Sequence, residues 1–410
     1  MNKWAVIIAV ISVSVISTEA QYLDKEHLSI DAEALEGNML PHNPDVRKSL
    51  RSRFCGIYSI GMGYQTLPSD SSVFASEYNY PLFGLRMSVA DFSCIKMVED
   101  SRLGNIYLLY GRMERPLIRK GCWQINYMLD AGLSFATAPH NRFTNPDNPF
   151  IGFRLMVYVG FGVGVNYKVT SRFEVGLSAN LRHYSNGRLG MPNSGINLFG
   201  AALSARYYLD PQPELFSKMP KWEFQKEWLF HLSAGVGGQA SLQEWTLDSH
   251  ADAKDRRAHY RLRPKFSFSA DAMYRYTPKY ATGIGIDLFH TGHIGLLRQW
   301  DRQLYPDRNP DNLKYSRLAV GVAVNQEIYY RNLALNASVG YYVFRRVGIH
   351  DKERFYQRAG FRYYFPKLNN AFVGIAIKAH RFTQAEYLEL SIGIRFTKKP
   401  SKFSKKEWNR

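Results

Sequence analysis

The sequence predicts an all-β fold, a transmembrane antiparallel β-barrel. Apolar and polar residues alternate in runs of about ten, as in strands that have one face toward lipid and one toward a lumen. Short turns and longer polar loops separate these runs alternately. After the extreme N-terminus, no stretch approaches the roughly 20 apolar residues that a membrane helix needs.

The first twenty residues differ from the rest of the chain. Lys3 is followed by an apolar stretch over 5–17, and small residues stand at Thr18 and Ala20. This order is typical of a secretory signal peptide, so we expect residues 1–20 to be removed on export. The alternative is an N-terminal anchor helix, for which the apolar stretch is too short.

Alternation is clearest in three segments, 158–167, 173–185 and 333–343. In the second, every odd position from Phe173 to Leu181 is apolar, and the even positions carry charged, polar or small side chains. Small residues gather on the polar face, which suits a narrow lumen. We therefore expect the odd positions of this segment to face lipid.

Counting such segments gives about sixteen strands. The expected ranges are 31–39, 53–65, 82–92, 104–114, 121–137, 152–168, 172–186 and 195–209, followed by 228–243, 264–277, 280–290, 315–329, 331–346, 354–365, 371–381 and 385–396.

A break over 210–227 contains three prolines and no alternation, and it divides the strands into two sets of eight. Two architectures fit: two tandem eight-stranded barrels, or one barrel of about sixteen strands. The break and the small residues inside favour the tandem. We then expect a first barrel over 21–212, a linker over 213–227, a second barrel half over 228–396 and a basic tail over 397–410.

The formal net charge of +18 points to an anionic partner. An exported protein rarely meets nucleic acid, whereas anionic lipid head groups attract Lys and Arg for the same electrostatic reason. The alternative for any single Lys is that it lies on an ordinary solvent-exposed basic surface and binds no partner. We expect membrane lipid as a partner and no nucleic acid.

The stretch "HYSNGRLGMPNSGIN" places His183 and Ser185 on the lipid-facing stripe of their strand. The two residues are about 6.6 Å apart along the strand, so an imidazole can lean toward a serine hydroxyl. Asn197 has the same outward parity in the next strand, across the loop over 187–194. Three polar side chains thus interrupt a lipid-facing belt. The alternative reading is ordinary polarity where strands leave the hydrocarbon.

These residues resemble the signature of the PagL-type lipid A 3-O-deacylases. The match consists of His183-x-Ser185-Asn186 followed by Pro192-Asn193-x-Gly195-Ile196, and the resemblance is strongest over 152–209. It implies an eight-stranded barrel in the cell outer membrane with a Ser-His-Glu triad on its membrane-facing side. That site removes the ester-linked acyl chain at position 3 of lipid A, the membrane anchor of lipopolysaccharide.

Carried onto this chain, the resemblance makes Ser185 the nucleophile and His183 the general base, and gives Asn186, Asn193 and Gly195 oxyanion or supporting roles. The acid of the family falls on Asn197, which is a departure. An asparagine can orient an imidazole but cannot stabilise an imidazolium by charge. Three outcomes are open: the enzyme works with Asn197 as the orienting group, it recruits another carboxylate, or its catalytic activity is low.

Other histidines are poorer candidates. His380 and Glu389 have inward parity in the last two strands, which predicts a lumen ion-pair network rather than a second active site. His290 and His293 lack the spacing of a metal site.

We expect no metal and no cofactor, and the sequence leaves a homodimer open. A different class of function is also open, namely an inert outer-membrane barrel with a structural or transport role.

Overall fold

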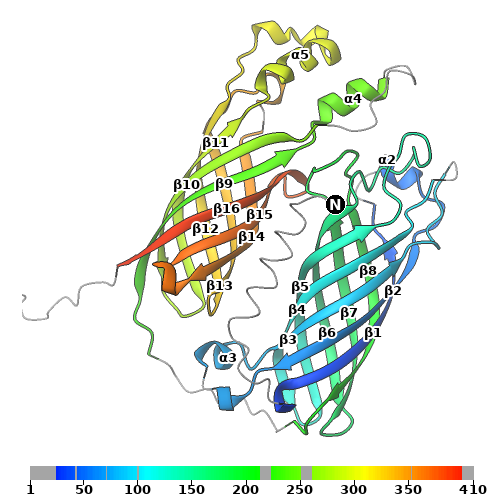
Figure 1. The fold of residues 1–410 in the computed structure, drawn as a ribbon, viewed down its shortest axis with the longest axis vertical. Helices are drawn as coiled ribbons and strands as arrows, with labels where there is room; N and C mark the ends of the chain where they lie inside the picture. Colours follow the sequence, from blue (N-terminus) through cyan, green and yellow to red (C-terminus); the bar gives the residue numbers. More distant parts are fainter. Residues whose placement is uncertain are drawn as a thin grey trace, which may run out of the picture.

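The protein folds into two closed β-barrels, each of eight antiparallel strands (Figure 1). The computed structural model describes residues 25–41, 44–70, 72–98, 101–212, 223–250, 261–351 and 353–398. The predicted signal peptide over 1–20 lies outside these ranges, as do most of the predicted linker and of the basic tail.

Consecutive strands pair throughout, and the last strand of each barrel closes against the first. The first barrel consists of β1 (Leu28–Met39), β2 (Phe54–Gln65), β3 (Leu82–Asp91), β4 (Asn105–Lys120), β5 (Trp123–Ala136), β6 (Leu155–Lys168), β7 (Phe173–Ser185) and β8 (Ile196–Tyr208). The second consists of β9 (Glu227–Gln239), β10 (Arg263–Arg275), β11 (Tyr280–Thr291), β12 (Leu318–Tyr330), β13 (Leu333–Phe344), β14 (Phe355–Phe365), β15 (Ala371–His380) and β16 (Gln384–Lys398).

Helices occur only between the strands of the described chain. The α-helices are α2 (Pro44–Lys48), α3 (Val73–Glu77), α4 (Leu242–His250) and α5 (Ile294–Leu304). Single 3-10 turns are η1 (Lys25–His27), η2 (Pro68–Asp70), η3 (Pro306–Arg308), η4 (Pro310–Asn312), η5 (Gly348–His350) and η6 (Pro366–Leu368). None of the described helices is both long enough and apolar enough to cross a membrane.

The prediction of two tandem barrels is confirmed, and the alternative of one sixteen-stranded barrel is wrong. Strand ends differ from the expected ones, most of all in β4, which continues to Lys120 instead of ending at residue 114. Pro116 lies where the register of β4 and β5 shifts. A bulge tolerates a proline, which cannot donate to the ladder, so the strand runs on past it.

Buried charges fill the lumen of the first barrel. Glu33 accepts hydrogen bonds from Arg112 at 2.5 Å and from Arg182 at 2.5 Å. Arg112 also holds Asp130 at 2.7 Å. Because charges away from water are stable only when they are paired, these contacts define a dry, plugged interior.

The second barrel is plugged in the same manner. Glu389 forms an ion pair with Arg358, and Arg358 also holds Asp287 at 3.0 Å. Arg362 holds Glu327 at 2.8 Å. The expected lumen network around Glu389 is therefore confirmed.

The two barrels point the same way. We call the end where β7 meets β8 and β15 meets β16 the loop end, and the opposite end the turn end. The loops over 137–154, 186–195 and 292–317 lie at the loop end. In outer-membrane barrels the longer loops are extracellular and the short turns are periplasmic.

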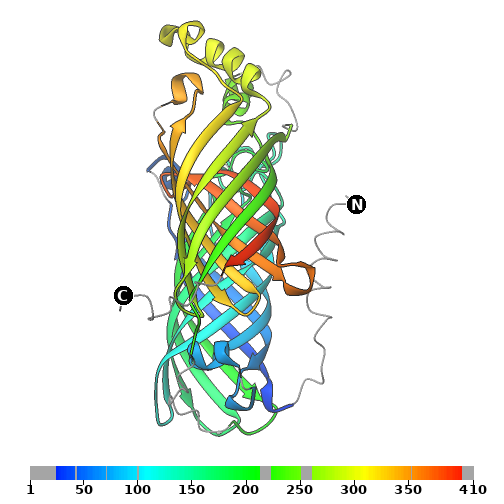
Figure 2. The ribbon, with the colours of Figure 1, turned by 90° about the vertical axis from the view of Figure 1, so that its left-hand side faces the viewer.

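The barrels touch at the turn end, where the segment that carries α3 reaches the turn between β12 and β13 (Figure 2). The Tyr78 hydroxyl donates to the carbonyl of Tyr329 at 2.8 Å, and Lys279 pairs with Glu77 at 2.9 Å. The rings of Phe83 and Tyr330 are 4.6 Å apart. Polar and aromatic contacts thus join the two units across a sequence separation of about 250 residues.

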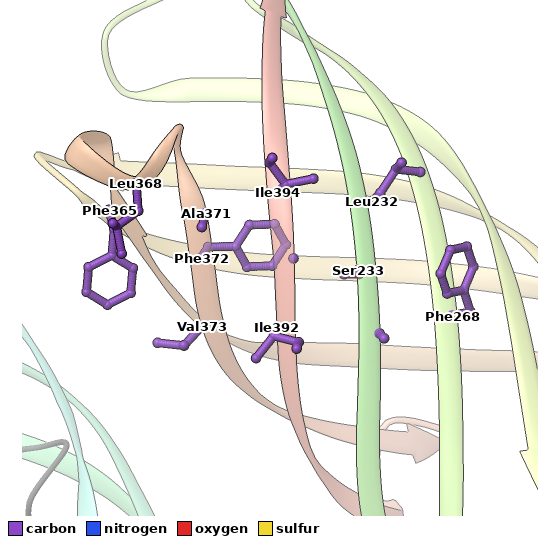
Figure 3. A pocket seen from close by; sticks show the side chains of 12 residues that line it. Leu232, Ser233, Phe268, Phe365, Leu368, Ala371, Phe372, Val373, Ile392 and Ile394 are labelled. Carbon is purple, nitrogen blue, oxygen red and sulfur yellow. The ribbon is translucent and has the colours of Figure 1, made fainter.

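An apolar recess of about 520 Å³ lies in the wall of the second barrel, between η6 and the strands β9, β10, β15 and β16 (Figure 3). Aliphatic and aromatic side chains, among them Leu232, Phe268, Phe372 and Ile392, line it. None of the predicted site residues contributes to its lining.

Candidate active site

His183 and Ser185 lie at the loop end of β7, on the outer wall of the first barrel. Their neighbours establish which way they point: Leu181 is 50% exposed, whereas Arg182 and Tyr184 are buried in the lumen. Since side chains alternate between the faces of a strand, His183 and Ser185 share the outward face of Leu181. The outward parity that the alternation predicts is therefore what the structure has.

His183 and Asn197 are direct partners in the ladder between β7 and β8. Their side chains meet outside the barrel, with His183 Nδ1 2.6 Å from Asn197 Oδ1. An amide oxygen only accepts, so Nδ1 carries the hydrogen of this contact and Nε2 remains as the basic ring nitrogen. The main chain of Asn197 is held in turn, because its carbonyl accepts from the N–H of Leu40 at 2.7 Å.

The Ser185 hydroxyl is turned toward the loop. Its Oγ accepts from the side-chain amide of Asn193 at 3.2 Å and from the N–H of Gly187 at 3.2 Å. Rotation about the Cα–Cβ bond of Ser185 gives Oγ two further staggered positions. Catalytic hydrogen bonds often tighten only when substrate is bound, so this orientation is compatible with a serine that His183 activates.

Asn186 and Asn193 bind the loop together. The side-chain oxygen of Asn193 accepts from the N–H of Asn186 at 3.3 Å. The buried Asn186 side chain donates to the carbonyl of Gly190 at 3.2 Å. In this arrangement Asn186 fixes the conformation of the loop, and the side-chain amide of Asn193 links the loop to Ser185.

Gly195 comes close to the imidazole. Its φ of +67° favours glycine, and a Cβ at this position would lie 3.3 Å from His183 Cε1. Gly195 therefore leaves room for the imidazole and adopts a backbone conformation that favours glycine. Its N–H already donates to the carbonyl of Phe150 at 3.3 Å.

Gly187 is the site residue that sequence reasoning missed. Its N–H donates to Ser185 Oγ, which makes it a main-chain donor beside the nucleophile candidate. The Asn186-Gly187 dipeptide directly after a strand is a turn signal that could have drawn attention to it.

The chain matches two protein-family models. The family model described as "Lipid A 3-O-deacylase (PagL)" matches residues 99–206, and "Acyloxyacyl hydrolase, C-terminal domain" matches residues 226–399. The chain carries PagL-family domains. PagL-family proteins are ester hydrolases of the outer-membrane β-barrel type, and each barrel of this chain carries one of the two family domains.

Several solved structures are similar to this chain at low identity. Neisserial surface protein A is 12% identical, with a TM-score of 0.30, over 44% of this chain and 96% of its own. The outer membrane enzyme PagL is 12% identical, with a TM-score of 0.27, over 42% of this chain and 97% of its own. Among curated proteins, none matches the chain.

The other candidate histidines belong to the second barrel. His380 faces the lumen of that barrel, where its Nε2 is 3.0 Å from Glu386. His293 is buried at the start of α5, and His290 is the second-to-last residue of β11. Within the described ranges, no group of three or more His, Cys, Asp or Glu residues could hold a metal ion.

Proposed function

We propose that this PagL-family protein removes the ester-linked acyl chain at position 3 of lipid A, with Ser185 as nucleophile, His183 as general base and Asn197 as the residue that orients His183. One observation carries the proposal. The 2.6 Å contact between His183 Nδ1 and Asn197 Oδ1 stands beside Ser185 on the lipid-facing wall. A nucleophile, a base and an orienting group are the parts that covalent ester hydrolysis needs.

The reaction has two halves. Ser185 Oγ attacks the ester carbonyl carbon as its proton passes to His183 Nε2, and a tetrahedral intermediate forms. When that intermediate collapses, the sugar oxygen leaves with the proton from His183 and the acyl group stays on Ser185. Water then attacks the acyl–enzyme with His183 again as base, which releases a fatty acid and restores the serine.

Two hydrogen-bond donors are available for the oxyanion. The N–H of Gly187 and the side-chain amide of Asn193 both lie 3.2 Å from Ser185 Oγ. Both donate to Ser185 Oγ in the resting site, and during attack they can turn toward the neighbouring carbonyl oxygen, where the negative charge develops. Asn186 acts through Asn193, by holding its side-chain oxygen.

The wall around the site is apolar and suits an acyl chain. On the side of His183 toward the membrane centre, Leu181, Phe199 and Phe161 are about half exposed and face outward. The site lies at the loop end, and this supports a position at the outer leaflet, where lipid A resides. An acyl chain of lipid A can thus lie against the barrel with its ester at Ser185.

We place the protein in the outer membrane, exported by the signal peptide expected over 1–20, with lipopolysaccharide as its partner. The homodimer that the sequence left open stays a prediction. The plugged lumens argue against the alternative of a solute channel, because paired charges and tyrosines occupy the interior of both barrels.

The experiment is a comparison of lipid A by mass spectrometry. Cells that make the protein should lose one ester-linked hydroxyacyl chain from lipid A, and cells that make Ser185→Ala at the same level should not. Unchanged lipid A in the presence of a folded wild-type barrel would contradict the proposal and leave the inert barrel as the remaining function.

A further inference from the structure

The turn that follows Ser185 has an uncommon backbone. The N–H of Leu189 donates to the carbonyl of Asn186 at 3.0 Å, which closes a four-residue turn. Both central residues are left-handed, with φ of +59° at Gly187 and +64° at Arg188. A left-handed conformation costs little at glycine, but it is strained at a residue such as arginine and persists only where the surroundings hold it.

The second barrel supplies those surroundings. The N–H of Ala240, one residue past β9, donates to the carbonyl of Arg188 at 2.7 Å. The outer wall of β15 and β16 lies against Gly187, where a Cβ would be 3.1 Å from Ile377 Cδ1 and 3.2 Å from Leu388 Cβ. The turn is therefore enclosed by residues of the second barrel, namely Ala240, Ile377 and Leu388.

The contacting wall is itself rigid. A β-bulge at Lys378/Ala379 turns Glu386 toward the lumen. There Glu386 meets Lys265 at 3.1 Å and His380 at 3.0 Å, and it also contacts Lys378. These ion pairs tie the ends of β15 and β16 to β10.

The contacts at the turn end complete the arrangement. Tyr78 and Lys279 join the barrels there, so the two units are fixed to each other at both ends. Contacts at two separate points limit the motion of one barrel relative to the other to rotation about the line between them. Because Ala240 and Ile377 contact the turn directly, the position of the second barrel bears on the position of the turn.

We propose that the second barrel acts in the reaction of the first, with Leu388, Ile377 and the N–H of Ala240 as positioning groups for the turn Asn186–Leu189. They hold Gly187 so that its N–H points at Ser185 Oγ. The proposal rests on the proposed function, because it assigns a role around the same serine. It also gives the C-terminal half a purpose that a single PagL-like barrel does not require.

The test uses the full chain and two substitutions. Ile377→Ala and Ile377→Val each remove the Cδ1 atom that packs on Gly187. Because a small displacement of a group at the reacting centre lowers the rate steeply, we expect kcat to fall about tenfold for Ile377→Ala and less for Ile377→Val, with KM unchanged. Leu390→Ala is the control, since Leu390 points outward from the neighbouring strand β16, is 46% exposed and should leave kcat unaltered.

A second readout separates positioning from folding. The rate at which a small fluorophosphonate labels Ser185, measured per mole of heat-modifiable barrel, should fall with kcat in Ile377→Ala and stay constant in Leu390→Ala. Wild-type rates in both Ile377→Ala and Ile377→Val would overturn the inference while leaving the proposed function intact. A wild-type protein that neither labels at Ser185 nor deacylates lipid A would instead refute the proposed function.

Discussion

Asn197 gives His183 an oxygen that accepts a hydrogen bond but carries no charge. The resemblance to PagL-type enzymes leads one to expect a carboxylate in this place, so a single side chain separates the observed site from the expected triad. An amide keeps the imidazole in the useful tautomer, yet it offers no counter-charge to the imidazolium that forms during attack. The chemistry of the site is therefore best tested at this residue.

The first prediction concerns Asn197. Asn197→Ala removes a neutral hydrogen bond worth about 1 kcal/mol, so kcat should fall roughly fivefold with little change in KM. Asn197→Glu restores a charge beside the imidazolium, and kcat should rise about tenfold. Steady-state deacylation of purified lipid A measures both. Full activity in Asn197→Ala would mean that another group orients His183.

A second prediction concerns the nucleophile and the base. Ser185→Ala should abolish deacylation, and His183→Ala should lower it by at least about 10²-fold, since general base catalysis contributes that much. Neither side chain closes the barrel, so the shift between heated and unheated samples in electrophoresis should be that of wild type. Retained turnover in Ser185→Ala would remove the serine from the mechanism.

Alternation was enough to predict strand β7 and the outward face of its odd residues, because the period of two is a local property of an extended chain. The same reasoning placed Asn197 outside the barrel. Alternation could not predict the left-handed conformation of Arg188 in the turn after Asn186, since Ala240 of the second barrel holds it. Alternation could not predict the orientation of the Ser185 hydroxyl toward Asn193 either.

At the level of elements, the loop between β7 and β8 leads to a third prediction. Gly195→Ala puts a methyl group 3.1 Å from the carbonyl of Tyr184 and 3.3 Å from His183 Cε1, at a φ of +67°. We expect a loss of roughly 1 kcal/mol in stability from the backbone alone, and a fall in kcat from the displaced imidazole.

Gly121→Ala is the control for that substitution. Gly121 has a φ of +57° and nothing within 4 Å of a new Cβ. It should share the loss of stability, measured as the melting temperature in detergent, but not the loss of activity. Equal activities in the two variants would show that the space beside His183 is not critical.

A fourth prediction follows from α5, in the loop between β11 and β12. Burial, together with Lys265 and Arg263, lowers the pKa of His293 to about 3. The folded loop therefore holds His293 neutral, whereas an opened loop lets it titrate near 6.5. Stability of the loop is full above pH 6.5 and decreases as the pH falls below that value.

Between pH 7 and pH 5 this histidine should destabilise the closed loop by about 1–2 kcal/mol. Protease cleavage within the loop over 292–317 measures the change as a faster rate at pH 5. His293→Gln should remove most of the pH dependence. A wild-type cleavage rate that is equal at both pH values would contradict the prediction.

At the scale of the whole molecule, the tandem is joined through few contacts and each barrel closes on itself. The break over 210–227 and the eight-strand count made this architecture predictable from sequence. The docking of one barrel on the other was not, because it depends on aromatic and polar residues such as Tyr78 and Tyr329 that no periodicity marks.

A fifth prediction is that residues 21–212 alone fold into a heat-modifiable barrel in detergent, since all of its strands pair within the fragment. Its kcat should be lower than that of the full chain, because the turn after Ser185 lacks its support. A fragment that never folds would show that closure of the first barrel depends on the second.

The lipid-facing position of His183 and Ser185 also determines how the enzyme meets its substrate. The site and the lipid A substrate lie in the same leaflet, so the enzyme finds its substrate by lateral diffusion in two dimensions. The rate should then depend on the mole fraction of lipid A in the bilayer and not on its bulk concentration. Dilution of the outer leaflet with inert phospholipid should slow turnover even when the total amount of lipid A is constant.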